Sequence, residues 1–339
     1  MQSSLACSTA WPQALTEASK TMNLRPLRPV TEEEIQKFER DGFVHLENIL
    51  SDDWVKLLDR TIEALAANPS GQVIDFTTLG MMAEATETVD ALVADGEWKD
   101  PEKRAWASPA AMANNILREE VAVENAQRGH FVSMTGAFRR CEPINELVCK
   151  SPVPEIASRL MRSKKVYVYD DQVLLKPPYT LEKTAWHQDN GYDHVAGDQL
   201  LGIRIPTTRE TMEMGPVGYL RGSHKDGVIY KVNYFISEVG NERDTGAPIP
   251  DIEGHEQDFE VEYCLPQPGD VVVHHLRTLH GAGGNRSKTT ARKAITIRYA
   301  GDDARFLHRP FAPPQDVFHL KNGDPLDLDP ANHPVVWPR

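Results

Sequence analysis

Apolar residues in the first half of the chain recur at helical spacing. A capping-box pattern of Thr31 and Glu34 predicts a helix that ends at Gly42, and a short strand is expected directly after it. Ser and Pro start signals followed by the same periodicity predict four more helices. One of these helices follows Ser51, and the other three cover 108–127, 142–149 and 153–162. Loops and short helices are expected over residues 72–105.

Strand-like patterns take over after Lys165. β-branched and aromatic residues form short runs that Pro and Gly punctuate, with no long helix between them. Such an order indicates an antiparallel sandwich or barrel rather than a parallel sheet. Strands are expected at 166–169, 173–175, 199–205, 216–220, 259–264, 270–275 and 293–299.

We interpret the chain as a single large domain over 31–310. It combines a helical part over 31–165 with a β-rich core over 166–300, and a lead-in segment (1–30) precedes it. A Pro-rich tail over 311–339 is expected to pack on the domain as irregular chain.

The composition narrows the class of partner. The 339 residues include 50 Asp and Glu against 37 Lys and Arg, which gives a net charge of −13. We therefore expect neither nucleic acid nor an anionic membrane as a partner. The sequence has no CxxC pair, secretory signal pattern or long apolar span, so reduced cysteines and a cytoplasmic location are expected. The oligomeric state is left open.

The most informative short motif is His187-Gln188-Asp189, preceded by Trp186. On a strand, residues two apart share a face, so His187 and Asp189 can reach one metal ion. One imidazole and one carboxylate need a further ligand, and a second His would complete the facial triad of non-haem Fe(II) oxygenases.

We choose His280 as that second His. It begins a Gly-rich segment that leads to Arg292, whose planar guanidinium can bind a dicarboxylate that also chelates the metal. His274 and His275 remain alternative ligands.

A family resemblance rests on several motifs in the same order. They are Phe38…Asp41-Gly42-Phe43-Val44, Asp171-Gln172…Leu175-Lys176-Pro177, Trp186-His187-Gln188-Asp189, Gly197-Asp198-Gln199, Gly218…Arg221-Gly222-Ser223-His224, Pro268-Gly269-Asp270-Val271 and His280-Gly281…Asn285-Arg286-Ser287…Arg292-Lys293-Ala294…Arg298-Tyr299. Over 31–310 the chain resembles the phytanoyl-CoA dioxygenase family of Fe(II)/2-oxoglutarate oxygenases.

The resemblance implies a mainly β fold with a helical buttress (α+β), whose core is a double-stranded β-helix, the cupin-like jelly roll. It implies Fe(II) bound by His187, Asp189 and His280, with O2 and 2-oxoglutarate as cosubstrates and Arg292 on the distal carboxylate of 2-oxoglutarate. An Asp at 189, rather than Gly or Ala, argues against the halogenating relatives. Gln172, Lys176 and Ser287 match positions of the cosubstrate region.

The implied reaction oxidises an unactivated C–H bond of a small molecule, with succinate and CO2 as co-products. Hydroxylation, desaturation and oxidative ring closure all remain open, as does the identity of the substrate.

Arg204 departs from the family pattern, because relatives commonly carry Trp there. If Arg204 faces the cavity it needs an anionic partner; the alternative is an outward side chain paired at the surface. Arg209 and Trp186 are further candidate substrate contacts. The two arginines, Arg204 and Arg209, motivate the hypothesis that the substrate is a small anionic metabolite. The long stretch over 225–258 is a candidate lid.

Other functions are left open by the residues. A facial-triad oxygenase that does not use 2-oxoglutarate, or a zinc hydrolase, would leave Arg292 without its carboxylate role. An inactive binding or regulatory protein on the same scaffold would not retain iron.

Overall fold

The computed structural model describes residues 22–67, 72–77, 129–233, 235–236, 244–310, 312 and 319–339. Four α-helices lie in the described N-terminal half, and none of the helices described is long and apolar enough to cross a bilayer. They are α2 (Glu32–Asp41), α3 (Asp52–Ala67), α8 (Glu142–Lys150) and α9 (Val153–Met161).

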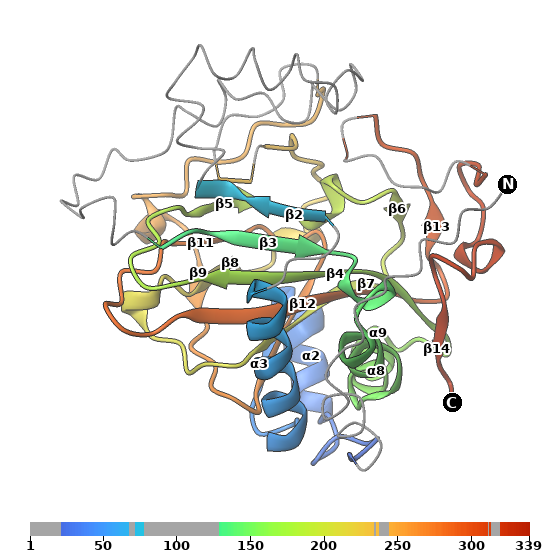
Figure 1. Cartoon of the computed structure of the whole chain (residues 1–339). Helices are drawn as coiled ribbons and strands as arrows, with labels where there is room; N and C mark the ends of the chain where they lie inside the picture. Colours follow the sequence, from blue (N-terminus) through green and yellow to red (C-terminus); the bar gives the residue numbers. More distant parts are fainter. Residues whose placement is uncertain are drawn as a thin grey trace, which may run out of the picture.

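Two antiparallel sheets face each other to form the β core (Figure 1). The larger has the order β1-β10-β7-β12-β4-β3-β2, with β14 also paired to β4, and the smaller has the order β5-β11-β8-β9. The larger sheet contains β1 (Phe43–Leu46), β2 (Gln72–Asp75), β3 (Val132–Thr135), β4 (Val166–Lys176), β7 (Leu200–Pro206), β10 (Val271–His275), β12 (Arg292–Ala300) and β14 (Val335–Trp337). The smaller contains β5 (Thr184–His187), β8 (Val217–Leu220), β9 (Val261–Tyr263) and β11 (His280–Ala282), while β6 (Val195–Ala196) and β13 (Arg305–Phe306) form a separate pair.

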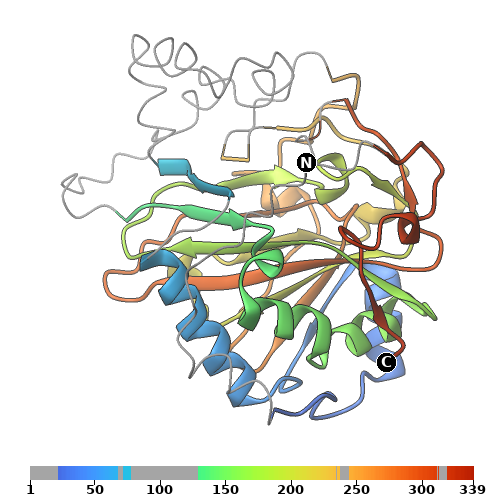
Figure 2. The ribbon, with the colours of Figure 1, turned by 45° about the vertical axis from the view of Figure 1, so that its right-hand side comes forward.

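The helices cover the outer face of the larger sheet (Figures 1 and 2). The main hydrophobic core joins helical residues such as Trp54 and Ile144 to strand residues such as Ile203, Val273 and Ile297. Side chains at alternate positions of a strand point to opposite faces. On β12 this alternation is complete, since odd-numbered residues face the helices while Arg292, Thr296 and Arg298 line the internal cavity. The same sheet therefore packs a core and builds a site.

The predicted fold class is confirmed, and most expected elements are present. The capping box of Thr31 and Glu34 is formed, and Gly42 ends α2 in a left-handed conformation (φ 85°), as expected. The predicted strands at 166–169 and 173–175 are one continuous strand, β4. The predicted helix at 108–127 lies outside the described residues.

Two expectations about local structure are wrong. Residues 72–75 form β2 instead of a loop, because β3 offers it a hydrogen-bonding edge that the sequence did not reveal. The Pro-rich tail is not wholly irregular, since β14 adds a strand to the larger sheet beside β4. Strands β1, β2 and β3 also join this sheet, so residue 165 does not separate helical from β structure.

Replacing Ile297 by Ala tests the helix-facing side of β12. Its side chain is fully buried, so loss of three carbon atoms is expected to destabilise the protein by about 2–5 kcal/mol. Urea unfolding followed by circular dichroism measures this, with the exposed Val335→Ala on β14 as a control expected to stay near wild type. Equal midpoints for both variants would contradict the packing described.

Candidate metal centre

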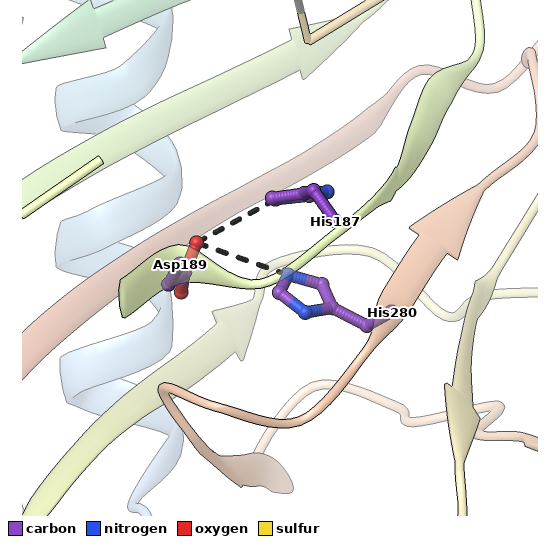
Figure 3. Close-up of side chains that lie close together, drawn as sticks. All are labelled: His187, Asp189 and His280. Atoms are coloured by element: carbon purple, nitrogen blue, oxygen red, sulfur yellow. Dashed lines mark ion pairs between the residues drawn. The ribbon is translucent and has the colours of Figure 1, made fainter. Parts of the chain in front are cut away.

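Three buried side chains converge inside the β core. Figure 3 shows His187, Asp189 and His280 pointing toward one another, and a ligand atom from each lies within 4.8 Å of the others. Asp189 Oδ1 is 3.5 Å from His187 Nε2 and 3.9 Å from His280 Nε2. The two histidines are paired directly across β5 and β11.

The position of Asp189 differs from the expectation of a shared strand face. Strand β5 ends at His187, and Asp189 begins a short 3-10 turn, η4 (Asp189–Gly191). The turn still directs the carboxylate toward the histidines, so the spacing of the motif matters more than a continuous strand.

Hydrogen bonds fix the tautomer of both histidines. The Nδ1 atom of His187 is 2.7 Å from the carbonyl oxygen of Ala185, and Nδ1 of His280 is 3.0 Å from that of Thr278. A carbonyl only accepts, so each Nδ1 carries the proton and each Nε2 presents a lone pair to the centre. Three acceptor atoms therefore meet there with no proton between them, which is the donor set a divalent cation requires.

The electrostatic surroundings keep these groups in the metal-binding form. Burial opposes ionisation of Asp189, but the Arg298 guanidinium and a hydrogen bond from His274 outweigh it and hold the pKa of this carboxyl well below its ordinary value. Burial, together with the neighbouring rings of His187 and His274, holds the pKa of His280 well below its ordinary value. An ionised carboxylate and a neutral imidazole result.

Lys176 and Arg292 supply positive charge on the cavity wall. Both are buried, and within the described residues no carboxylate oxygen lies within ion-pair distance of either. The Lys176 amine donates to the carbonyl of Gly283 at 3.0 Å and lies 4.2 Å from the centre of the Phe131 ring. Burial lowers the pKa of Arg292 to about 10, with the charge of Arg204 acting in the same direction. A dianionic ligand would pair with the Arg292 guanidinium and with the Lys176 amine in its protonated form.

Arg204 faces the cavity, but its charge is already neutralised. Its guanidinium forms a buried ion pair with Glu210, in the turn after β7. Arg204 therefore does not need a carboxylate of the substrate as its partner, contrary to the expectation. The alternative expectation, a side chain that faces outward, is also wrong.

The structure places three other predicted residues away from the cavity. Arg209 lies after β7 on the surface, where it is exposed and donates a hydrogen bond to the side-chain oxygen of Gln267. Trp186 alternates with His187 on β5 and packs instead against an apolar cluster that includes Tyr230. Ser287 accepts hydrogen bonds from backbone amides and shapes the turn before β12.

Gln172 lines the cavity, and further lining residues were missed at the sequence level. Arg298 follows Arg292 by six positions on one strand, so period-two alternation could have placed it inside. No sequence pattern indicated Phe235, because its position depends on the path of a loop. The backbone at Phe235 has a φ of 65°, and the centre of its ring lies 5.4 Å from the centre of the His187 ring. His274 lines the cavity. Its neighbour His275 points to the other face of β10, where its Nε2 forms a hydrogen bond with the carbonyl oxygen of Asp198.

A family model settles the classification. The model of the phytanoyl-CoA dioxygenase family (PhyH) matches residues 38–294. The chain belongs to this family. It is a 2-oxoglutarate-dependent non-haem iron dioxygenase that acts with Fe(II), 2-oxoglutarate and O2, as predicted from the motifs.

Curated relatives agree with this classification. An ectoine dioxygenase of Stutzerimonas stutzeri is 22% identical over 90% of this chain and 89% of its own. A probable α-ketoglutarate-dependent hypophosphite dioxygenase of the same species is 30% identical over 48% of this chain and 54% of its own.

Solved structures share the fold. The α-ketoglutarate-dependent carbocyclase SnoK from nogalamycin biosynthesis has a TM-score of 0.60 at 20% identity, covering 91% of this chain and 96% of its own. The ectoine dioxygenase EctD from S. alaskensis, solved with 2-oxoglutarate and 5-hydroxyectoine, has a TM-score of 0.54 at 20% identity, covering 89% and 92%. The likeness establishes the jelly-roll core.

Removing one partner of the Arg204–Glu210 pair tests its role. Glu210→Gln leaves a buried guanidinium without its counter-charge, so a loss of about 3–5 kcal/mol in unfolding free energy is expected. The double variant Arg204→Met/Glu210→Gln is expected to recover most of that loss. Denaturant unfolding of all three proteins measures it, and a Glu210→Gln variant as stable as wild type would contradict the pairing.

Proposed function

We propose that this dioxygenase binds Fe(II) through His187, Asp189 and His280. The observation that carries the proposal is the convergence of three buried acceptor atoms with no proton between them. Two imidazoles and one carboxylate are the ligands of non-haem Fe(II) oxygenases, and they leave positions free for other ligands. When bound, the iron supplies the oxidising chemistry with O2, while the protein supplies binding, orientation and exclusion of water.

Arg292 and Lys176 are the proposed partners of the two carboxylates of 2-oxoglutarate. Arg292 is a buried cation and Lys176 a buried amine, and neither has a carboxylate partner in the described part of the chain. With Lys176 protonated, the two side chains match the charge of the dianion. Gln172 lines the same wall, where its amide donates to Ser133 and its oxygen accepts from Arg298.

The substrate we propose is a small metabolite whose reacting C–H group lies along the apolar side of the cavity. Phe235, Leu174 and Val217 are the larger apolar side chains of its lining, and Phe235 stacks on Phe76 in a separate apolar cluster. Relatives named for ectoine and hypophosphite support a small substrate. Hydroxylation is the simplest outcome, and desaturation or oxidative ring closure would use the same site.

We also propose the cytoplasm as the compartment and a single domain over 31–310. Cys141, Cys149 and Cys264 are free thiols, as is typical of proteins in a reducing compartment. Burial raises the pKa of Cys141 and Cys264 to about 12, so these two thiols stay in the unreactive protonated form.

Anaerobic binding tests the function directly. The protein is expected to bind one Fe(II) and one 2-oxoglutarate together, and to release succinate when O2 and substrate are supplied. His187→Ala and His280→Ala are expected to abolish iron binding, because each removes one of three ligands. Arg292→Met should instead keep iron and lose 2-oxoglutarate affinity by about 100-fold or more, since a buried charged hydrogen bond is worth about 2–5 kcal/mol.

The readouts separate the competing functions. Iron binding without 2-oxoglutarate binding would favour the facial-triad oxygenase that does not use this cosubstrate. Failure of the wild-type protein to bind iron at all would contradict the proposal and favour an inactive scaffold.

Binding of 2-oxoglutarate is expected to take up a proton. Burial, reinforced by the charges of Arg292 and Arg204 and opposed by Glu182 and Glu210, holds the pKa of Lys176 well below its ordinary value. A nearby dianion raises that pKa, so affinity falls as pH rises through the range between the free and bound values. Calorimetry in two buffers of different ionisation enthalpy measures the uptake. Lys176→Met should abolish it, and an unchanged proton count in that variant would contradict the assignment.

A further inference from the structure

The two carboxylate oxygens of Asp189 have different partners. Oδ1 is the oxygen nearest to His187 Nε2 and His280 Nε2, at 3.5 and 3.9 Å. Oδ2 lies 3.0 Å from Nε2 of His274, on β10 of the opposite sheet. Because an ionised carboxylate only accepts, His274 must donate this hydrogen bond from Nε2.

His274 is therefore oriented by the carboxylate and is not free to bind metal. Its Nε2 carries the proton of this hydrogen bond, and its other nitrogen, Nδ1, is buried without a hydrogen-bond partner among the described residues. The ring is also confined, because a Cβ atom at Gly202 would lie 2.8 Å from its Cε1. Only glycine leaves room for the ring at this point of β7.

Arg298 approaches Asp189 from the neighbouring strand β12. Its Nη2 donates to Asp189 Oδ1 at 3.0 Å and to Gln172 Oε1 at 3.2 Å, and its Nε lies 3.6 Å from Asp193 Oδ2. Two hydrogen bonds from Nη2 thus hold the guanidinium, and it supplies the positive charge that stabilises the buried carboxylate.

We propose that His274 and Arg298 are positioning residues that hold Asp189 so that it binds iron through Oδ1 alone. This inference rests on the proposed metal site. With Oδ2 engaged by the His274 N–H, the carboxylate offers one oxygen and leaves a coordination position that a two-oxygen contact would occupy. Groups that hydrogen-bond to metal ligands in this way fix ligand orientation and tune affinity.

Substitution of His274 tests the inference. His274→Leu is expected to weaken Fe(II) binding by about 10–100-fold, the usual effect of losing such a partner. His274→Gln, whose amide can donate from a similar position, is expected to recover most of the affinity. The charge-transfer absorption of the anaerobic Fe(II)–2-oxoglutarate complex should be shifted in His274→Leu and close to wild type in His274→Gln.

His275→Leu is the matched control. This neighbour on the same strand is buried and loses a hydrogen bond to Asp198, but it does not touch Asp189, so iron affinity within about threefold of wild type is expected. Arg298→Lys, which keeps the charge and one donor, should lose less affinity than Arg298→Met. These conservative variants decide the question if His274→Leu fails to fold.

Three results would overturn the inference while leaving the proposed function intact. Wild-type affinity and spectrum in His274→Leu would mean that the contact does not position the ligand. Loss of iron in His274→Gln as complete as in His280→Gln would make His274 a ligand itself. Equal losses in the His274 and His275 variants would indicate a general packing effect. Failure of the wild-type protein to bind iron would instead contradict the proposed function.

Discussion

The buried carboxylate of Asp189 is the group on which the site depends. A charge removed from water is costly unless it is paired and fully hydrogen-bonded. Arg298 supplies the pairing charge and His274 supplies a donor, so the carboxylate stays ionised although it is almost fully buried. Oδ1 also faces two imidazole lone pairs, so these three atoms could hold a metal ion.

The jelly-roll architecture explains how residues far apart in sequence meet around this carboxylate. His187 and His280 are cross-strand neighbours in the smaller sheet, while Arg292 and Arg298 come from the larger sheet on the other side of the cavity. The other face of the larger sheet packs against the helices. Stability and chemistry are therefore supplied by alternate residues of the same strands, and a register shift by one residue would exchange them.

Local signals were the most predictable part of this protein. The capping box of Thr31 and Glu34 depends only on neighbouring residues, so the sequence was sufficient for it. The His187–Asp189 spacing predicted that the two side chains lie close together, but the turn that brings Asp189 there was not expected. The partner of Arg204 was not predictable, because Glu210 reaches it only through the turn after β7. The place of Phe235 likewise depends on how a long loop packs, for which no periodicity exists.

A crystal grown anaerobically with Fe(II) and measured at the iron absorption edge would locate the iron directly. We expect one anomalous peak bound by Nε2 of His187, Nε2 of His280 and Oδ1 of Asp189, with Oδ2 still hydrogen-bonded to His274. Iron bound elsewhere on the chain, or a site that uses His274 in place of His280, would contradict this expectation.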